Sequence, residues 1–267
     1  MQRAGEVKRG AGVGDESRIT LACLDLAGTT VADDGIGERA FSEALATQGI
    51  VSGTDTYNRA MTRVHAARGR SKLDIFREVF ADEDRAQAAN HAFEQAYDSI
   101  IDRVGLAPIP GAETAIDALA ASGVRICLMT GFSSRTLGHI IDTLGWWKRA
   151  DLLLCPADAG GRGRPYPDMI LTAAMQVKVD DVRHIAVCGD TESDMRSGRR
   201  SGAAIVAGTL TGAHDRTRLE AAGATHVIGS IAELPVLVEG FRGPDPDDPR
   251  RSHGTMASGH SSSPGRL

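Results

Sequence analysis

Six short apolar runs recur along the middle of the chain, and most segments between them carry apolar residues at helical spacing. A short run that is apolar throughout, with turn residues on either side, is typical of a strand buried on both faces. Strands that alternate with helices pair into one parallel sheet with helices on both of its faces. The sequence therefore predicts an α/β fold, with strands at residues 19–25, 124–130, 150–155, 185–190, 204–208 and 226–228.

The interval between the first two predicted strands is too long for a single crossover helix. Apolar residues recur at helical spacing in four stretches of it, at residues 38–47, 56–67, 71–80 and 84–104. Pro108 and the pair Pro110-Gly111 end the interval, and a further helix is expected at residues 112–121. We therefore expect an all-helical cap domain at residues 35–106, inserted into a parallel-sheet core domain formed by residues 18–34 and 107–242.

The two ends of the chain lack apolar periodicity. Residues 1–17 are rich in Gly, Arg and Glu, and residues 243–267 are rich in Pro, Asp, Ser, Gly and His, so we expect two disordered tails.

The position of the cap in the sequence predicts where it lies in the fold. In open parallel sheets ligands bind beyond the carboxyl ends of the strands, so an insert after the first strand lies over the binding site.

The first predicted strand ends in a carboxylate that is followed by a glycine turn. Residues 25–30 read Asp-Leu-Ala-Gly-Thr-Thr. An aspartate at this place is typical of a residue that accepts a phosphoryl group. Enzymes that hydrolyse ordinary phosphate esters usually carry a second aspartate two residues later, which protonates the leaving oxygen. This chain has Ala27 there, so either the protein is inactive or its leaving group needs no such acid.

Two later strand ends carry groups that hold phosphate oxygens. Thr130 and Gly131 end the second predicted strand, where a hydroxyl and exposed backbone N–H groups bind anions. Arg164 follows the third strand and offers a forked, permanently charged donor. Each feature alone has a simpler explanation, because Thr-Gly is a common turn and Arg-Pro is usually part of a surface loop.

The fourth predicted strand ends in Asp190, and residues 189–194 read Gly-Asp-Thr-Glu-Ser-Asp. Gly-Asp after a strand is often only a helix cap. A hard cation such as Mg²⁺ prefers oxygen ligands, which Asp25, Asp190, Asp194 and the backbone carbonyl of Ala27 would supply. Four such groups in this order, each at the carboxyl end of a strand, rarely arise by chance, so we favour a catalytic site.

This ordered set resembles the haloacid dehalogenase superfamily of aspartyl-phosphate enzymes over residues 20–236. Residues 25–30, 163–167 and 189–195 are similar to phosphonatase, that is phosphonoacetaldehyde hydrolase, and to the phosphonatase-like hydrolases. The resemblance implies a Rossmann-like core under a helical cap, Mg²⁺ as cofactor and Asp25 as the nucleophile. It also implies a set of phosphate-binding residues, namely Gly28, Thr29, Thr130, Gly131 and Arg164, the last where most members have lysine.

Lysine is rare in this chain, which has 30 Lys and Arg residues but uses lysine only at positions 8, 72, 148 and 178. Lys72 falls in the segment where phosphonatases carry the lysine that forms an imine with the substrate aldehyde. Ser71 and Asp74 fit a capping box, which would place Lys72 in the first turn of a helix. The helix dipole and neighbouring arginines then disfavour the ammonium form. On local sequence alone a surface lysine is the simpler explanation, and Ala27 reverses that preference.

Ala27 and Lys72 explain one another. Cleavage of a C–P bond expels a carbanion, which an acid placed beside an ester oxygen would not stabilise. A protonated imine between Lys72 and an aldehyde one carbon from the C–P bond accepts the electrons and becomes an enamine as Asp25 attacks phosphorus. Our leading hypothesis is therefore a Mg²⁺-dependent hydrolase that cleaves the C–P bond of a 2-oxoalkylphosphonate.

Three positions depart from the phosphonatase pattern. Phosphonatases carry a histidine three residues after the cap lysine and a tyrosine after the Thr-Gly pair, where this chain has Ile75 and Phe132. The usual Met-Gly before the lysine segment is Arg68-Gly69 here. The group that transfers protons at the imine is therefore unassigned; His65 is one candidate, although a lone histidine is more often a surface or packing residue. These changes favour the phosphonatase-like group and a substrate bulkier or more anionic than phosphonoacetaldehyde.

Composition limits the other classes. Hydrophobic residues make up 42% and charged residues 24% of the chain, an ordinary globular balance. No apolar stretch approaches the roughly 20 residues of a membrane span, so we expect a cytoplasmic protein without a membrane partner. The net charge of −5 and the scattered arginines give no reason to expect nucleic-acid binding.

The Trp-Trp pair at residues 146–147 raises the hypothesis of a homodimer interface, although we favour burial at a helix end. All four cysteines read as buried free thiols: Cys23, Cys127, Cys155 and Cys188.

Two rival functions stay open. A phosphomonoesterase that uses another proton donor is disfavoured by Ala27. A catalytically silent ligand-binding protein is disfavoured by the intact set of Asp25, Thr130, Arg164 and Asp190. In all three cases the expected partner is a small-molecule phosphonate or phosphate.

Overall fold

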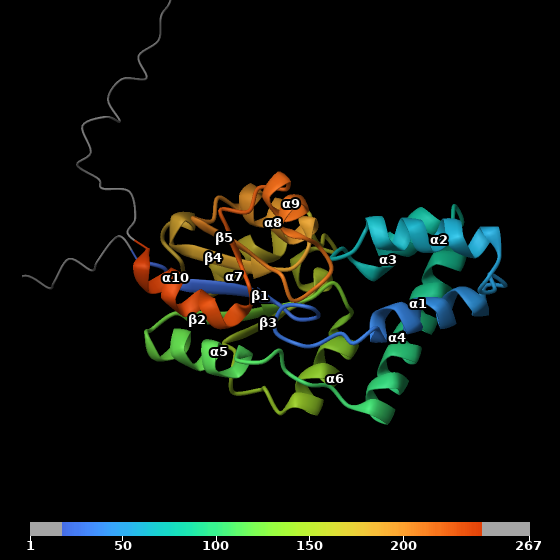
Figure 1. The fold of residues 1–267 in the computed structure, drawn as a ribbon, viewed down its shortest axis with the longest axis horizontal. Helices are drawn as coiled ribbons and strands as arrows, with labels where there is room; N and C mark the ends of the chain where they lie inside the picture. The colour runs from blue at the N-terminus through green and yellow to red at the C-terminus, as the bar shows by residue number, and fades with distance from the viewer. Residues whose placement is uncertain (1–17, 242–267) are drawn as a thin grey trace, which may run out of the picture.

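The computed structural model describes residues 18–241, which form one six-stranded sheet with helices around it (Figure 1). Every strand pair is parallel, and the strand order β3-β2-β1-β4-β5-β6 places β1 at the centre between β2 and β4. The strands are β1 Leu21–Asp25, β2 Arg125–Met129, β3 Leu152–Leu154, β4 Ile185–Gly189, β5 Ile205–Thr209 and β6 His226–Ile228. The α/β fold with a parallel sheet is therefore confirmed.

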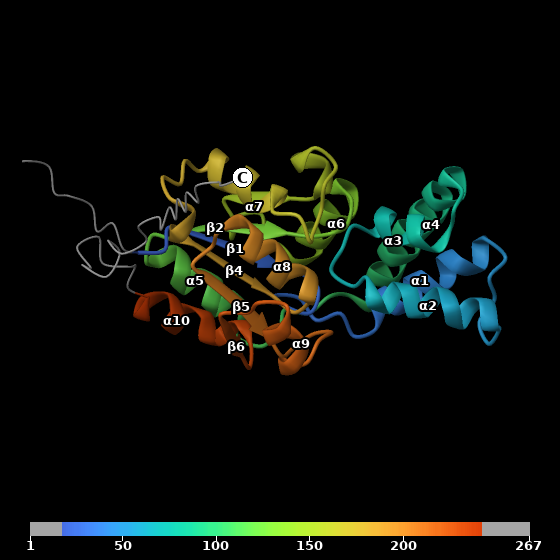
Figure 2. The same cartoon turned by 90° about the horizontal axis from the view of Figure 1, so that it is seen from above.

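Helices cover both faces of this sheet, as the continuous apolar strands require (Figure 2). Successive side chains of a strand point to opposite faces, so Ala22 and Leu24 lie in one core cluster and Leu21 and Cys23 in another. The first cluster includes residues of α5 Ala112–Ala121, α6 Ser134–Leu144 and α10 Leu234–Gly240; the second includes residues of α7 Asp168–Gln176, α8 Glu192–Ser201 and α9 Arg216–Ala221. Short 3-10 helices complete the core at η1 Pro156–Ala159, η2 Val182–His184 and η3 Ile231–Glu233.

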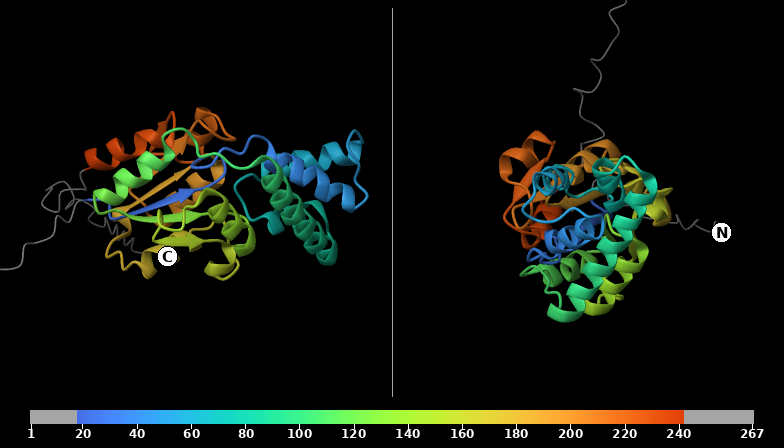
Figure 3. Two further views of the ribbon diagram at one scale, coloured as in Figure 1. Left: turned by 90° about the horizontal axis from the view of Figure 1, so that it is seen from below. Right: turned by 90° about the vertical axis from the view of Figure 1, so that its right-hand side faces the viewer.

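Four helices fill the interval between β1 and β2 and pack on one another to one side of the sheet (Figure 3). They are α1 Ile36–Thr47, α2 Asp55–Ala66, α3 Lys72–Val79 and α4 Glu83–Val104. Aromatic rings from three of them meet, because the ring centroid of Phe41 lies 5.3 Å from that of Phe76 and 4.4 Å from that of Phe93. We call these helices the cap; its exact limits at residues 35–106 stay a prediction.

Other local expectations have mixed outcomes. Ser71 is the N-cap of α3, and Lys72 is its first residue, but the Ser71 side chain accepts no capping hydrogen bond, so the predicted capping box is wrong. Instead the backbone N–H of Lys72 donates to the carbonyl of Gly131, at 3.1 Å. All four cysteines are free and buried. Trp146 is fully buried, as we favoured, and Trp147 is 55% exposed. The two predicted tails lie outside the described residues, in which no helix is long and apolar enough to cross a membrane.

Candidate active site

Asp25 lies at the carboxyl end of β1 and is buried. The chain then turns tightly, because the carbonyl of Leu26 accepts hydrogen bonds from the backbone N–H groups of residues 29–31. Gly28 permits the close approach of the next strand end: its φ is +89°, and a Cβ there would lie 2.6 Å from Asp190 Oδ2. The turn thus brings the ends of β1 and β4 together.

Arg164 reaches this point from the loop that follows η1. Its Nη1 donates to Asp25 Oδ1 at 2.5 Å and also to Asp194 Oδ1, and the side chain is buried. Burial raises the pKa of Asp25 to about 6, although the charge of Arg164 lowers it, and the charge of Asp194 raises it further. Asp194 therefore helps to hold the guanidinium beside Asp25.

Asp190 directly follows β4 and is held by two donors. Its Oδ2 accepts from the backbone N–H of Ala213 at 2.7 Å, and its Oδ1 accepts from Thr29 Oγ1 at 3.2 Å. Burial is the main cause that raises the pKa of Asp190 to about 8, and the charges of Asp25 and Asp194 add to it. The protein thus places mutually repelling carboxylates in a buried position.

These carboxylates fit a divalent cation. Oxygens of Asp25, Asp190 and Asp194 lie within 4.8 Å of one another, and all three residues are buried. Arg164 neutralises only part of their charge, and an all-oxygen donor set is the kind that Mg²⁺ prefers. Both oxygens of Asp194 already accept hydrogen bonds, from Arg164 and from Thr191, so Asp194 has less capacity for a metal than Asp25 and Asp190.

Thr130 and Gly131 follow β2. They line the same cavity as Asp25, and Gly131 also contacts the cap. Thr130 is buried, and its Oγ1 accepts from the backbone N–H of Phe132 at 3.3 Å. The carbonyl of Gly131 accepts from Lys72, and a Cβ on Gly131 would lie 2.3 Å from the carbonyl oxygen of Arg70. The loop between α2 and α3, residues 67–71, therefore docks directly on the end of β2, and glycine is needed at that contact. We call this segment the cap loop.

Lys72 is half-buried where this loop enters α3. Its Nζ lies 4.6 Å from the centroid of the Phe132 ring. Burial lowers the pKa of Lys72 to about 8, helped by the charge of Arg164, while the charges of Asp25 and Asp33 oppose that shift. The lowered pKa favours the free amine, which is the form of lysine that attacks a carbonyl carbon.

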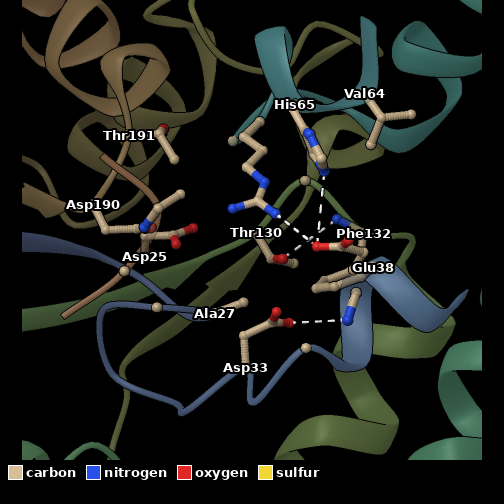
Figure 4. Close-up of a pocket in the computed structure, with 18 of the residues that line it drawn as sticks. Asp25, Ala27, Asp33, Glu38, Val64, His65, Thr130, Phe132, Asp190 and Thr191 are labelled. Carbon is tan, nitrogen blue, oxygen red and sulfur yellow. Dashed lines mark hydrogen bonds and ion pairs between the residues drawn. The ribbon is translucent and has the colours of Figure 1, made fainter. Parts of the chain in front are cut away.

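Apart from Asp194 and Thr29, these groups line one cavity of about 430 Å³ between sheet and cap. In Figure 4, Asp25, Asp190 and Thr191 lie on one side of it, and Val64, His65 and Glu38 lie on the opposite side. Five large apolar residues also line the cavity: Phe41, Met61, Val64, Ile109 and Phe132. The cavity thus combines a charged end at the sheet with a cap side on which apolar and charged side chains are mixed.

The predicted site residues line this cavity except for two buried ones: Thr29, which contacts Asp190, and Asp194, which contacts Arg164. Ile75 does not line it, because its side chain is buried in the core cluster. His65 does line it, but its Nε2 lies 3.7 Å from Glu38 Oε2, on which Arg68 also converges at 3.4 Å. The motifs gave no sign of Glu38 or of Asp33, which also lines the cavity. The only signal in the sequence for these two residues is their position, because both follow the turn after Asp25, where the chain enters the cap.

A family model described as haloacid dehalogenase-like hydrolase matches residues 19–202. The chain belongs to this family of hydrolases. The match covers β1 to α8 and so includes Asp25, the cap helices and Asp190. The predicted superfamily is therefore confirmed.

Relatives of this haloacid dehalogenase-like hydrolase include phosphonatases. The phosphonoacetaldehyde hydrolase of Bacillus cytotoxicus is 28% identical over 205 residues, which are 68% of this chain and 76% of that protein. The crystal structure of a phosphonoacetaldehyde hydrolase like protein from Oleispira antarctica aligns with a TM-score of 0.71 and 22% identity, over 87% of this chain and 96% of the other. A predicted phosphatase from Clostridium acetobutylicum aligns with a TM-score of 0.70 and 18% identity, over 84% and 99%. At these identities the two structures show a common fold.

Proposed function

We propose that this hydrolase cleaves the C–P bond of a 2-oxoalkylphosphonate through an imine on Lys72 and an aspartyl-phosphate on Asp25. The observation that carries the proposal is one pair of groups in one cavity. A half-buried lysine with a lowered pKa lines the same cavity as Asp25, whereas Ala27 occupies the position of the usual leaving-group acid. The similarity to the phosphonoacetaldehyde hydrolase of Bacillus cytotoxicus supports the same reaction class.

The phosphonate group binds at the charged end of the cavity. Arg164 donates to the oxygens on phosphorus, and Thr130 and the backbone of Gly28 and Gly131 hold them from the turns after β1 and β2. Bound Mg²⁺, held by Asp25, Asp190 and the carbonyl of Ala27, would screen the negative charge that builds up there. Asp25 is then free to attack phosphorus from the end of β1.

The carbonyl carbon of the substrate reaches Lys72 on the cap side. The amine forms an imine there, and the protonated imine accepts the electron pair of the C–P bond as Asp25 Oδ attacks phosphorus. The products of this step are an enamine on Lys72 and a phosphorylated Asp25. Water hydrolyses the acyl phosphate and regenerates Asp25, and protonation and hydrolysis of the enamine release the aldehyde or ketone.

Borohydride reduction tests the imine directly. With phosphonoacetaldehyde present, borohydride should inactivate the wild-type enzyme and leave a covalent adduct on Lys72, identified by peptide mass. Lys72→Arg keeps the charge but removes the nucleophilic amine, so it should lose phosphate release. Lys148→Arg, which changes an exposed lysine, is the matched control and should behave as wild type. A fully active enzyme without label on Lys72 excludes the imine.

A phosphomonoesterase is the second candidate, and the position of His65 on the cavity wall favours it, since this imidazole could protonate an ester oxygen. The two functions differ in their best substrate. A higher kcat/KM for small phosphate esters than for any oxophosphonate, with that activity lost in His65→Gln, would establish the phosphomonoesterase and refute C–P cleavage.

A further inference from the structure

The imine chemistry needs a proton carrier that the motifs do not supply. The position three residues after Lys72 holds Ile75, a buried core residue, and the residue after the Thr-Gly pair is Phe132, which has no hydroxyl. The side chain of Lys72 forms no ion pair within residues 18–241, and its Nζ lies over the Phe132 ring, 4.6 Å from the ring centroid. Some other group must therefore move protons between the lysine nitrogen and the carbonyl oxygen.

Asp33 has the position for this role. It lies on the loop that leads from the Asp25 turn into α1, between Ala27 and Glu38, and lines the cavity with Lys72 (Figure 4). Its Oδ1 accepts from the backbone N–H of Gly37 at 3.2 Å, which fixes the carboxylate at the start of α1. Its Oδ2 has no hydrogen-bond partner in the described part of the chain and is free to contact substrate.

The charge of Asp33 also acts on the Lys72 amine. Among the charges that raise the pKa of Lys72, that of Asp33 has the second largest effect, smaller than that of Asp25 and larger than that of Asp190. The two other aspartates are already engaged, Asp25 by Arg164 and Asp190 by Thr29 and Ala213. Asp33 is the carboxylate of this group that stands outside the phosphoryl site.

The alternative carriers are less well placed. His65 is nearly half-exposed and paired with Glu38, which Arg68 also contacts, so both cationic side chains of this cluster are directed at Glu38. Neither His65 nor Glu38 is among the main charges that act on Lys72. The structure therefore distinguishes the cluster of His65, Glu38 and Arg68 from Asp33, which lies on the loop after Asp25 and is partly buried, whereas its neighbour Asp34 is exposed.

We propose that Asp33 is the proton-transfer residue of imine formation and hydrolysis in this cavity, a role that rests on the proposed function. Asp33 first takes a proton from the Lys72 ammonium, the free amine attacks the carbonyl carbon, and a C–N bond forms as the carbonyl electrons move to oxygen. Two protons of the original ammonium pass in succession from nitrogen through the Asp33 carboxylate to that oxygen. The C–O bond breaks, water leaves, and Asp33 ends as the carboxylate it was at the start. Hydrolysis of the product imine runs the same transfers in reverse.

The test compares two reactions of one set of variants. The first is the single-turnover rate at which borohydride traps phosphonoacetaldehyde on Lys72. The second is hydrolysis of acetyl phosphate with Mg²⁺ present, which uses Asp25 but needs neither an imine nor a leaving-group acid. Asp33→Asn keeps the acceptor for Gly37, and Glu43→Gln removes an exposed carboxylate from α1 as the matched control.

Asp33→Asn should lower the trapping rate by about 10²- to 10⁴-fold, the usual contribution of a positioned acid-base group. Its acetyl phosphate hydrolysis should stay within about twofold of wild type, and Asp33→Glu should recover part of the trapping rate. Trapping at the wild-type rate in Asp33→Asn overturns the assignment, as does an equal loss of both reactions, which would show a structural role. Failure of trapping in the wild-type enzyme refutes the proposed function instead.

Discussion

Gly131→Ala should separate the cap from the phosphoryl site by a small, calculable amount. The added Cβ would lie 2.3 Å from the carbonyl oxygen of Arg70, whereas ordinary contacts begin at 3.4 Å. The Cβ position is fixed by the backbone and the oxygen is part of the backbone, so neither atom can move aside by a side-chain rotation. The docked loop must therefore move by about 1 Å, which also strains the hydrogen bond from Lys72 N–H to the Gly131 carbonyl.

A displacement of this size matters because covalent chemistry needs its groups in near-contact geometry. A misplacement of about 1 Å typically costs on the order of 100-fold in rate. We therefore expect Gly131→Ala to lower kcat/KM for phosphonoacetaldehyde by about 100-fold. Acetyl phosphate hydrolysis, which does not use Lys72, should fall much less. Stopped-flow or coupled measurement of phosphate release gives both values.

Gly138→Ala is the matched control, because the added Cβ on α6 meets nothing within 4 Å. It should leave both reactions unchanged. Thermal unfolding of the two variants shows whether the alanine disturbs the fold instead of the docking. If Gly131→Ala releases phosphate from phosphonoacetaldehyde as fast as wild type, the docked position of the cap loop is not the reacting one, and the steric argument fails.

Three further predictions concern charge and metal. Burial lowers the pKa of Lys72 to about 8, so the rate at which borohydride traps phosphonoacetaldehyde on Lys72 should rise about tenfold per pH unit below pH 8 and level off above it. A trapping rate that keeps rising to pH 10 contradicts the burial argument. Ala27→Asp places a second charge beside Asp25 and also supplies the acid that ester hydrolysis uses. C–P cleavage should therefore fall about tenfold or more, and weak ester hydrolysis should appear. Unchanged phosphonate turnover counts against the role of Ala27. Chelation of divalent cations should abolish phosphate release, restored by Mg²⁺, and Asp25→Asn should be inactive with Mg²⁺ present; retained activity in either case refutes the aspartyl-phosphate route.

The sequence predicted the sheet and the ends of its strands well, because both depend on local signals. Each apolar run predicted a strand, and the polar residue that ends it, such as Asp25 or Asp190, marks the point where the strand leaves the core. Helix limits in the cap were predicted to within two residues for the same reason. Parallel order then follows from the alternation of strands and helices.

The contacts between segments could not be predicted in this way. Ser71 was expected to cap α3 with its side chain, but the start of α3 is instead held by Gly131 from a distant strand end. The coupling of Asp194 to Arg164, 30 residues earlier, likewise depends on how α8 packs. Asp33 and Glu38 belong to no motif, and their importance appears only when the fold brings the cap over Asp25.

The position of the reactive amine has a consequence for how this enzyme could diversify. Asp25, Arg164 and Asp190 all belong to the sheet and its loops, whereas Lys72 belongs to an inserted segment that touches the sheet at a few glycine-lined points. Under the proposed function, phosphoryl acceptance and stabilisation of the departing carbon would therefore be encoded in separate stretches of sequence. Exchange of the insert would alter which bond is broken and leave the phosphorus chemistry intact, so new specificities are accessible without rebuilding the catalytic aspartate's surroundings.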